Sequence, residues 1–258
     1  MERAEHGLSN RRNELGRGGF ETGSDTYERA RPGYPDSAVA HLAAAAGITT
    51  GSRVLDLAAG TGKLTRQLHD LGASCVAVEP SPSMRGVFTR AVPGVPVVGG
   101  TAEQVPIGSA TMDAVVVAQA FHWFDPEVAL AEVARVLSLG GWLGLIWNER
   151  DESDPMVAEM VRISKWDTFA PYPVGRDFGK VIDASGRFGP VERTKVPFVQ
   201  ELDRRTFVEQ VASRSYVQVL PEADRQVLLG QVAEFADQLP EPIGMPYITD
   251  LFCAQLRG

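Results

Sequence analysis

Cysteine is scarce in this sequence, and it has neither a long apolar run nor an excess of basic residues. The two cysteines, Cys75 and Cys253, are too few for a disulfide framework or a metal cluster, and they favour a reducing, cytoplasmic setting. Apolar runs such as residues 114–118 have five members, whereas a membrane span needs roughly 18. With 33 acidic and 25 basic residues the net charge is −8, so we expect neither nucleic acid nor a membrane as a partner.

What remains is an ordinary globular composition, with 44% apolar residues in 258 positions. The length suits one large α/β domain, with or without a modest insertion. Residues 1–25 are polar and lack an apolar core, so we do not expect a secretory signal there. This segment is either a flexible tail or an arm that docks on another subunit, and the second alternative would make the protein a homo-oligomer.

Short apolar segments alternate with helical segments of about ten residues in the first half of the chain. The alternation predicts parallel strand–helix–strand units in an open, doubly wound, mostly parallel α/β sheet with helices on both faces. We treat residues 26–258 as a single domain with helical insertions at about 150–187 and 203–240, which could cap a pocket. Predicted strands cover residues 53–57, 75–78, 95–98, 114–118, 142–147, 191–199 and 247–256. Gly140 and Gly141 are expected to end the helix that Asp125 caps.

The most informative segment is residues 54–65, in which a strand delivers Asp56 to its end before an Ala-Gly-Thr-Gly turn. Glycines there let a ligand approach the backbone, although a tight strand-to-helix turn would also explain them. A P-loop is excluded, because Leu57 and Leu64 stand where that motif needs Gly and Ser or Thr. The dinucleotide fingerprint fits poorly, since Thr65 takes the place of its third Gly or Ala. The carboxylate of Asp56 suits a cationic ligand instead.

Glu79 ends the next predicted strand, 23 positions after Asp56. A carboxylate there can accept hydrogen bonds from the two hydroxyls of a ribose, which indicates a nucleoside ligand. A solvated acid before a proline turn is the simpler alternative. Met84 follows, and its thioether either lies against an adenine ring or belongs to the core.

Four segments together resemble the class I S-adenosylmethionine-dependent methyltransferases, and among them the type 11 small-molecule branch with its trans-aconitate methyltransferase-like enzymes. The segments are the glycine loop 54–65 (motif I), the acid-to-Met stretch 79–84, residues 100–106, and the aromatic run 119–125 with its upstream partner 27–35. The resemblance implies a seven-stranded Rossmann-like methyltransferase fold, S-adenosyl-L-methionine as cofactor and S-adenosyl-L-homocysteine as product. It also implies that residues 26–36 fold over the cofactor as a lid.

Carried onto this sequence, the resemblance implies a set of cofactor-binding residues. They are Tyr27, Arg31, Asp56, Ala58, Gly60, Thr61, Gly62, Glu79, Pro80, Met84, Thr101, Ala102, Glu103, Gln119 and Ala120. Ala58 departs from the family, standing where the first glycine usually lies. We expect this change to be small, because Ala tolerates most backbone conformations except positive φ. Thr101 replaces a frequent Asp and would offer the adenine amino group a weaker acceptor.

We therefore predict methyl transfer to a small organic acceptor by in-line displacement, without a metal or a covalent intermediate. His122 is the candidate general base, and shaping the pocket wall is an equally good role for it. The acceptor walls are assigned to Trp123, Trp166, Tyr172 and Tyr216, although each would also suit a core. Two alternatives stay open. One is a non-catalytic binder of adenosylmethionine or adenosylhomocysteine, and the other is a nicotinamide-dependent oxidoreductase, which Asp56 and the missing third glycine oppose.

Overall fold

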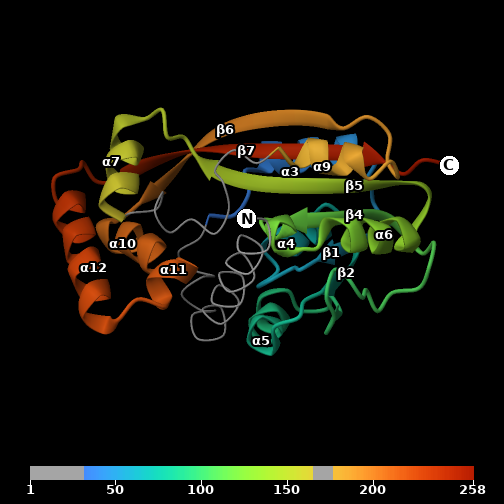
Figure 1. Ribbon diagram of the computed structural model, residues 1–258, viewed down its shortest axis with the longest axis horizontal. Helices are drawn as coiled ribbons and strands as arrows, with labels where there is room; N and C mark the ends of the chain where they lie inside the picture. The colour runs from blue at the N-terminus through green and yellow to red at the C-terminus, as the bar shows by residue number, and fades with distance from the viewer. Residues whose placement is uncertain (1–31, 165–176) are drawn as a thin grey trace, which may run out of the picture. The chain divides into compact units, whose positions relative to one another are not determined.

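The computed structural model describes residues 32–164 and 177–258, which form an α/β protein on one seven-stranded sheet (Figure 1). The strands are β1 (Arg53–Leu57), β2 (Ser74–Val78), β3 (Val97–Val98), β4 (Met112–Ala118), β5 (Leu137–Arg150), β6 (Glu192–Leu202) and β7 (Ile243–Gln255). The helices are α3 (Asp36–Ala45), α4 (Lys63–Asp70), α5 (Pro82–Ala91), η1 (Phe121–Trp123), α6 (Pro126–Val136), α7 (Pro155–Ser164), α9 (Phe178–Ala184), α10 (Arg204–Ala212), α11 (Ser215–Gln218) and α12 (Glu222–Ala236). The predicted doubly wound fold is confirmed.

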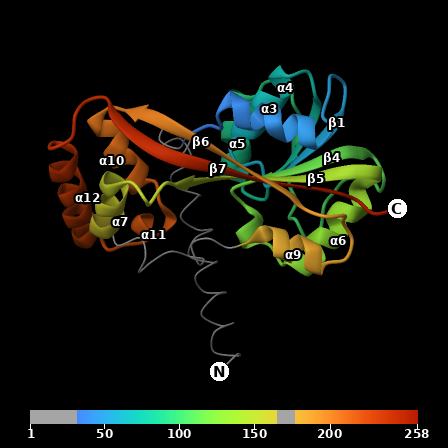
Figure 2. The same ribbon diagram turned by 90° about the horizontal axis from the view of Figure 1, so that it is seen from above.

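The strand order, β3-β2-β1-β4-β5-β7-β6, reverses beside β1. From β1 the chain moves outward to β2 and β3, then returns to the other side of β1 as β4, and these neighbours all pair in parallel. Helices α3 and α4 lie on one face of this part of the sheet, and α6 and α9 lie on the other (Figure 2). In open α/β sheets a ligand binds at the carboxyl ends of the strands where the order reverses. The ends of β1 and β4 are therefore the place to look for a site.

Two compact units make up the chain. Of the described residues, unit 1 holds 32, 150–164 and 197–247, and unit 2 holds 33–149, 177–196 and 248–258. The helices of unit 1, which are α7, α10, α11 and α12, fall within the two insertions that the sequence predicts. The single domain of residues 26–258 stays a prediction, and its N-terminal segment 1–25 lies outside the described residues.

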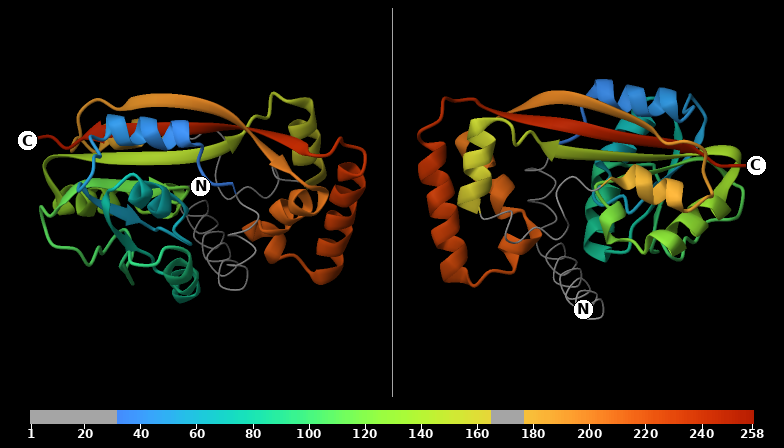
Figure 3. Two further views of the ribbon diagram at one scale, coloured as in Figure 1. Left: turned by 180° about the vertical axis from the view of Figure 1, so that it is seen from behind. Right: turned by 45° about the horizontal axis from the view of Figure 1, so that its top comes forward.

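Each unit has its own apolar core. In unit 2, residues such as Leu42, Leu68 and Phe88 are fully buried between the sheet and its helices. The thiols of Cys75 and Cys253 are buried in this unit too, and burial raises the pKa of each to about 12. In unit 1, α12 lies beside α10 and α7 (Figure 3) around a core that includes Phe207 and Val232. Within residues 32–164 and 177–258 no helix has the length and hydropathy to cross a membrane.

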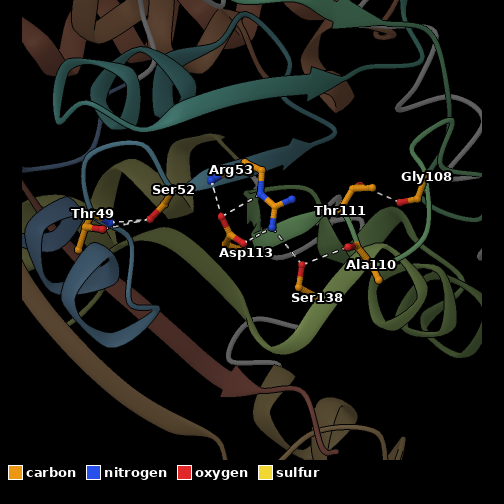
Figure 4. A network of polar contacts seen from close by, with 8 residues as sticks. All are labelled: Thr49, Ser52, Arg53, Gly108, Ala110, Thr111, Asp113 and Ser138. Carbon is orange, nitrogen blue, oxygen red and sulfur yellow. Dashed lines mark hydrogen bonds and ion pairs between the residues drawn. The ribbon is translucent and has the colours of Figure 1, made fainter.

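The amino ends of β1, β4 and β5 are tied together by an exposed polar network (Figure 4). Both the backbone amide and the guanidinium of Arg53 donate to the Asp113 carboxylate, at 2.8 Å and 2.5 Å. The Arg53 guanidinium holds the pKa of Asp113 below its usual range, and it also donates to the hydroxyl of Ser138 at 3.2 Å. The charged groups at the amino ends of these strands bind one another, so their contacts are internal to the protein.

The fifth strand departs from the sequence prediction. Gly140 and Gly141 do not end a helix; they lie inside β5, whose fourteen residues make it much longer than the predicted 142–147. A Cβ on Gly141 would stand 2.9 Å from the carbonyl oxygen of Ser138 and 3.0 Å from that of Asp113, so only glycine fits there. The pairing of β4 with β5 shifts register at this point. The glycine pair thus lies at a bulge in β5, and this bulge depends on the pairing of β5 with β4.

Candidate cofactor and acceptor site

The loop after β1 has an unusual backbone. Ala58, Gly60 and Gly62 all have positive φ, at 59°, 58° and 85°. For Ala58 this overturns the expectation that its replacement of glycine is a small change, because a left-handed conformation strains a residue with a Cβ by about 1–2 kcal/mol. Strained backbone of this kind is concentrated at binding and catalytic sites.

The two glycines of the loop have different roles. A Cβ on Gly62 would stand 2.6 Å from Val92 and 2.7 Å from Phe88, so this glycine permits the close packing of α4 on α5. A Cβ on Gly60 would meet no described atom within 4 Å. Gly62 is therefore required by packing, whereas Gly60 borders open space that a ligand could fill.

Asp56, the next-to-last residue of β1, is a buried carboxylate with 1% of its surface exposed. Its Oδ2 accepts a hydrogen bond of 2.5 Å from the hydroxyl of Thr65 on α4. Its Oδ1 is buried and has no hydrogen-bond partner among the described residues. Burial raises the pKa of Asp56 to about 7, the Thr65 hydroxyl acts in the opposite direction, and the nearby charge of Glu79 raises it further. An unpaired carboxylate oxygen in such a place calls for a donor or a cation.

Glu79 follows β2 directly and is bonded to the glycine loop. Its Oε2 accepts the backbone amide of Gly60 at 2.9 Å, and its Oε1 accepts that of Ser81 at 2.8 Å. Burial raises the pKa of Glu79, while these two amide bonds lower it. Arg85 holds the turn from outside, donating to the carbonyls of Glu79 at 2.7 Å and of the exposed Pro80 at 2.8 Å. Each carboxylate oxygen still has acceptor capacity for a ligand hydroxyl.

The stretch that begins at Thr101 is held against α6. Thr101 is exposed and Ala102 is buried, while Glu103 accepts the backbone amide of Asp125, the N-cap of α6, at 3.0 Å. Further along, the Glu132 carboxylate on α6 accepts the amide of Val105 at 2.9 Å. Oε1 of Glu103 thus fastens the loop to α6, and the predicted contact of Glu103 with the cofactor stays a prediction. Met84, another predicted contact, is buried in α5.

The aromatic run after β4 is also shaped by positive φ, which Gln119 adopts at 57°. The Gln119 side chain donates to the carbonyl of Asn148 at 3.1 Å, and Ala120 beside it is buried. His122 is half-buried, and its ring lies 4.3 Å from that of Trp123 and 5.1 Å from that of Trp147. The run therefore presents an imidazole among indole rings just beyond the end of β4.

Two amide side chains that sequence reasoning missed hold the segment before α3. Gln67 on α4 bonds both backbone groups of Tyr34, accepting its amide at 3.3 Å and donating to its carbonyl at 2.7 Å. Asn148, at the far end of β5, donates to the carbonyl of Gly33 at 3.0 Å and accepts the hydroxyl of Thr249 at 2.7 Å. No sequence motif marks these residues, because their partners are distant along the chain.

Two of the four predicted acceptor walls, Tyr216 and Trp123, lie among the described residues, one in each unit. Tyr216 belongs to the core of unit 1, with 8% of its surface exposed and its hydroxyl donating to the carbonyl of Ser164 at 2.9 Å. These contacts favour the packing role for Tyr216. Trp123 lies in unit 2, in the aromatic run. Trp166 and Tyr172, like the predicted cofactor contacts Tyr27 and Arg31, lie outside the described residues.

Taken together, the carboxyl ends of β1 and β2 fit a ligand that is a cationic nucleoside. The unpaired Oδ1 of Asp56 suits the positive charge, Glu79 suits ribose hydroxyls, and the open space at Gly60 admits the ligand to the backbone. S-adenosylmethionine, with its sulfonium and ammonium groups, has this chemistry. Among the described residues no group of His, Cys, Asp and Glu side chains could hold a metal ion.

Comparisons with known proteins agree with this description. Residues 55–145 match a family model described as a methyltransferase domain, Methyltransf_11. An uncharacterized methyltransferase of Mycobacterium bovis is 40% identical over 238 residues, which cover 89% of this chain and 92% of the relative. A crystal structure of a methyltransferase assigned to an antibiotic biosynthesis pathway in Anabaena variabilis is 20% identical, with a TM-score of 0.62 over 86% of this chain and 98% of that one.

A second solved structure was determined with ligands. It is a phosphoethanolamine N-methyltransferase of Haemonchus contortus in complex with phosphomonomethylethanolamine and S-adenosylhomocysteine. It is 17% identical, with a TM-score of 0.57 over 92% of this chain and 58% of that one. At this identity the likeness concerns the fold.

Proposed function

Because the chain belongs to the family of S-adenosylmethionine-dependent methyltransferases, we propose that it methylates a small organic acceptor at the carboxyl ends of β1, β2 and β4. The observation that carries the proposal is the bonded pair of Gly60 and Glu79 beside the buried Asp56. This arrangement joins an acceptor for ribose hydroxyls to a carboxylate for a cation. A nicotinamide cofactor, with its anionic pyrophosphate, would be repelled by Asp56.

We assign the cofactor contacts by the part of the cofactor that each residue suits. Asp56 faces the cationic methionine portion and Glu79 accepts the ribose hydroxyls. Thr101 and the backbone amide of Ala102 bind the adenine edge. The remaining contacts follow the family resemblance and comprise Tyr27, Arg31, Ala58, Thr61, Gly62, Pro80, Met84, Gln119 and Ala120.

When bound, S-adenosylmethionine supplies a methyl group that its sulfonium makes electrophilic. A lone pair of the acceptor forms the bond to the methyl carbon as the carbon–sulfur bond breaks, and the electron pair of that bond goes to sulfur. The leaving thioether needs no acid, so the protein contributes by orienting the reactants and excluding water, effects that reach about 7–11 kcal/mol.

His122 takes the proton where the acceptor is a hydroxyl or an acidic carbon, and a carboxylate acceptor would need no base. The indole ring of the half-buried Trp123 beside His122 favours an acceptor with an apolar or aromatic part. We place His122 at the acceptor because the aromatic run that contains it lies beyond the end of β4, the strand that adjoins β1.

Isothermal calorimetry of the purified protein with S-adenosylmethionine, S-adenosylhomocysteine and NADH tests the proposal first. We expect micromolar binding of the first two and none of the third, and binding of NADH alone would overturn it. A screen of small acceptors with labelled methyl donor then tests turnover. Tight cofactor binding without transfer to any small acceptor would indicate a non-catalytic binder.

A further inference from the structure

Thr65 is a buried hydroxyl residue in a position where the core would otherwise favour an apolar side chain. It lies in the first turns of α4, has no exposed surface, and is flanked by the buried Leu64 and Leu68 of the same helix. A buried hydroxyl is costly unless it finds a partner. Thr65 finds one in Asp56, whose Oδ2 lies 2.5 Å away on the adjacent strand β1.

The bond divides the two oxygens of Asp56 between different roles. Oδ2 is engaged by Thr65, so the plane of the carboxylate is fixed, and Oδ1 is left buried without a partner among the described residues. A short bond to a charged acceptor also stabilises the ionised form of a carboxyl group. Orientation and ionisation of Asp56 are thus both controlled from α4.

The other groups around Asp56 oppose its ionisation. On the β2 side the charge of Glu79 raises the pKa of Asp56, and the nearby Cys75 is a neutral thiol because burial raises its pKa to about 12. On the β4 side the residue in register with Asp56 is the apolar Val116. Burial is the largest cause that raises the pKa of Asp56, and Thr65 lowers it, through its hydroxyl first and its backbone second.

We propose that Thr65 is a positioning residue of the cofactor site, whose hydroxyl orients Asp56 and favours its ionised form for the cationic part of S-adenosylmethionine. The inference rests on the proposed placement of the cofactor at Asp56. Thr65 itself does not touch the cofactor; it acts through the carboxylate.

The matched variants are Thr65→Val, which keeps the shape and loses the hydroxyl, and Thr65→Ser, which keeps the hydroxyl and loses the methyl group. Calorimetry with S-adenosylmethionine between pH 6 and pH 9 gives the affinity of each protein. A hydrogen bond to a charged group contributes enough for Thr65→Val to weaken binding about tenfold near pH 7. The loss shrinks as the pH rises, because the carboxyl group of the variant then ionises, and Thr65→Ser behaves like the parent protein.

A second readout needs no cofactor. Infrared titration of the carboxyl carbonyl band, assigned by its disappearance in Asp56→Asn, follows ionisation of Asp56 directly. We expect the midpoint to move to higher pH in Thr65→Val and to stay in place in Thr65→Ser. Circular dichroism confirms folding, and if Thr65→Val does not fold, Thr65→Ala replaces it in both measurements.

Three results would overturn the inference or its premise, and they are distinguishable. A parent protein that does not bind S-adenosylmethionine removes the proposed function, while the infrared titration still tests the action of Thr65 on Asp56. An unchanged midpoint and unchanged affinity in Thr65→Val overturn the inference alone. Equal losses in Thr65→Val and Thr65→Ser show that the methyl group and its packing matter, and the hydroxyl does not.

Discussion

The amide of Gly60 donates a hydrogen bond of 2.9 Å to Oε2 of Glu79, so the glycine loop and the acid after β2 form one bonded unit. The second oxygen of Glu79 accepts the amide of Ser81 at 2.8 Å. Two backbone amides thereby fix the carboxylate before any ligand arrives. A preorganised acceptor of this kind reduces the ordering cost of binding.

Replacing Glu79 with Gln should weaken cofactor binding at least tenfold. The amide keeps one acceptor oxygen and turns a donor toward a backbone N–H, so one of the two bonds is lost along with the charge, a cost of about 1.5–3 kcal/mol. Calorimetry with S-adenosylmethionine measures the change. Glu127→Gln, at an exposed acid on α6, is the control and should bind as the parent does; equal affinity of the two variants would remove Glu79 from the site.

Replacing Asp56 with Asn should make the cofactor-free protein more stable at pH 8. The pKa of Asp56 is about 7 in the folded protein, above its value of 3.8 in the unfolded chain. Between these values the folded state binds the extra proton, so stability falls as the pH rises toward 7 and is constant above it. At 1.36 kcal/mol per pKa unit, the rise of this pKa from 3.8 to about 7 corresponds to roughly 4 kcal/mol of stability lost by pH 8.

Urea unfolding of both proteins at pH 5 and pH 8 checks this expectation. The parent should lose more stability than Asp56→Asn between the two pH values, and parallel losses would contradict the raised pKa. The same substitution should weaken cofactor binding, so that stability and affinity change in opposite directions.

The two glycines of the loop should respond differently to alanine. Gly62→Ala places a Cβ within 2.7 Å of Val92 and Phe88, and we expect it to destabilise the fold by about 2–4 kcal/mol. Gly60→Ala meets no described atom and costs about 1–2 kcal/mol in backbone strain. It should fold but lose cofactor affinity, because the methyl group occupies the ligand's space. Thermal unfolding and calorimetry on both variants separate the effects, and full affinity in Gly60→Ala would refute the assignment.

Ala58→Gly should stabilise the protein, contrary to the usual effect of glycine. Relief of the positive φ gains about 1–2 kcal/mol, and the extra freedom of glycine in the unfolded chain costs about 0.4–1 kcal/mol. The net gain of about 0.5–1 kcal/mol is measurable by urea unfolding. Ala59→Gly, one residue along and without positive φ, should destabilise the protein. A change in stability of the same sign in both variants would contradict the positive φ at Ala58.

His122→Gln should lower turnover of a hydroxyl or acidic-carbon acceptor by about 10²–10⁴-fold. Cofactor affinity should stay nearly unchanged, because the assigned contacts of the cofactor lie elsewhere. Steady-state kinetics on the acceptor found by the labelled-methyl screen gives the first value and calorimetry the second. Unaltered turnover would leave His122 with a role in shaping the pocket wall.

Much of the fold could be predicted from local sequence. Helix α5 spans Pro82–Ala91, and its start is marked in the sequence by local signals, which are Pro82 at its first position and the polar turn before it. Asp125 caps α6 as expected, accepting the amides of Glu127 and Val128. The placement of Asp56 and Glu79 at neighbouring strand ends also followed from the strand pattern alone.

What could not be predicted depends on contacts between distant segments. The bond from Thr65 to Asp56 requires the rotation of α4 on the sheet, which no spacing in the sequence reveals. The length of β5 depends on pairing with β4, and for this reason the prediction that the glycine pair at 140–141 ends a helix is wrong. Positive φ at Ala58 is likewise imposed by the loop as a whole, against the preference of the residue.

Chemical modification of the two buried thiols can report local opening of this protein. Cys75 lies in β2 and Cys253 in β7, both inside unit 2, and neither forms a thiolate readily at neutral pH because burial raises its pKa. A thiol reagent can therefore react with either strand only when that strand opens. The rate of modification reports opening of these strands without any engineered label, and its slowing by cofactor would report their protection on binding.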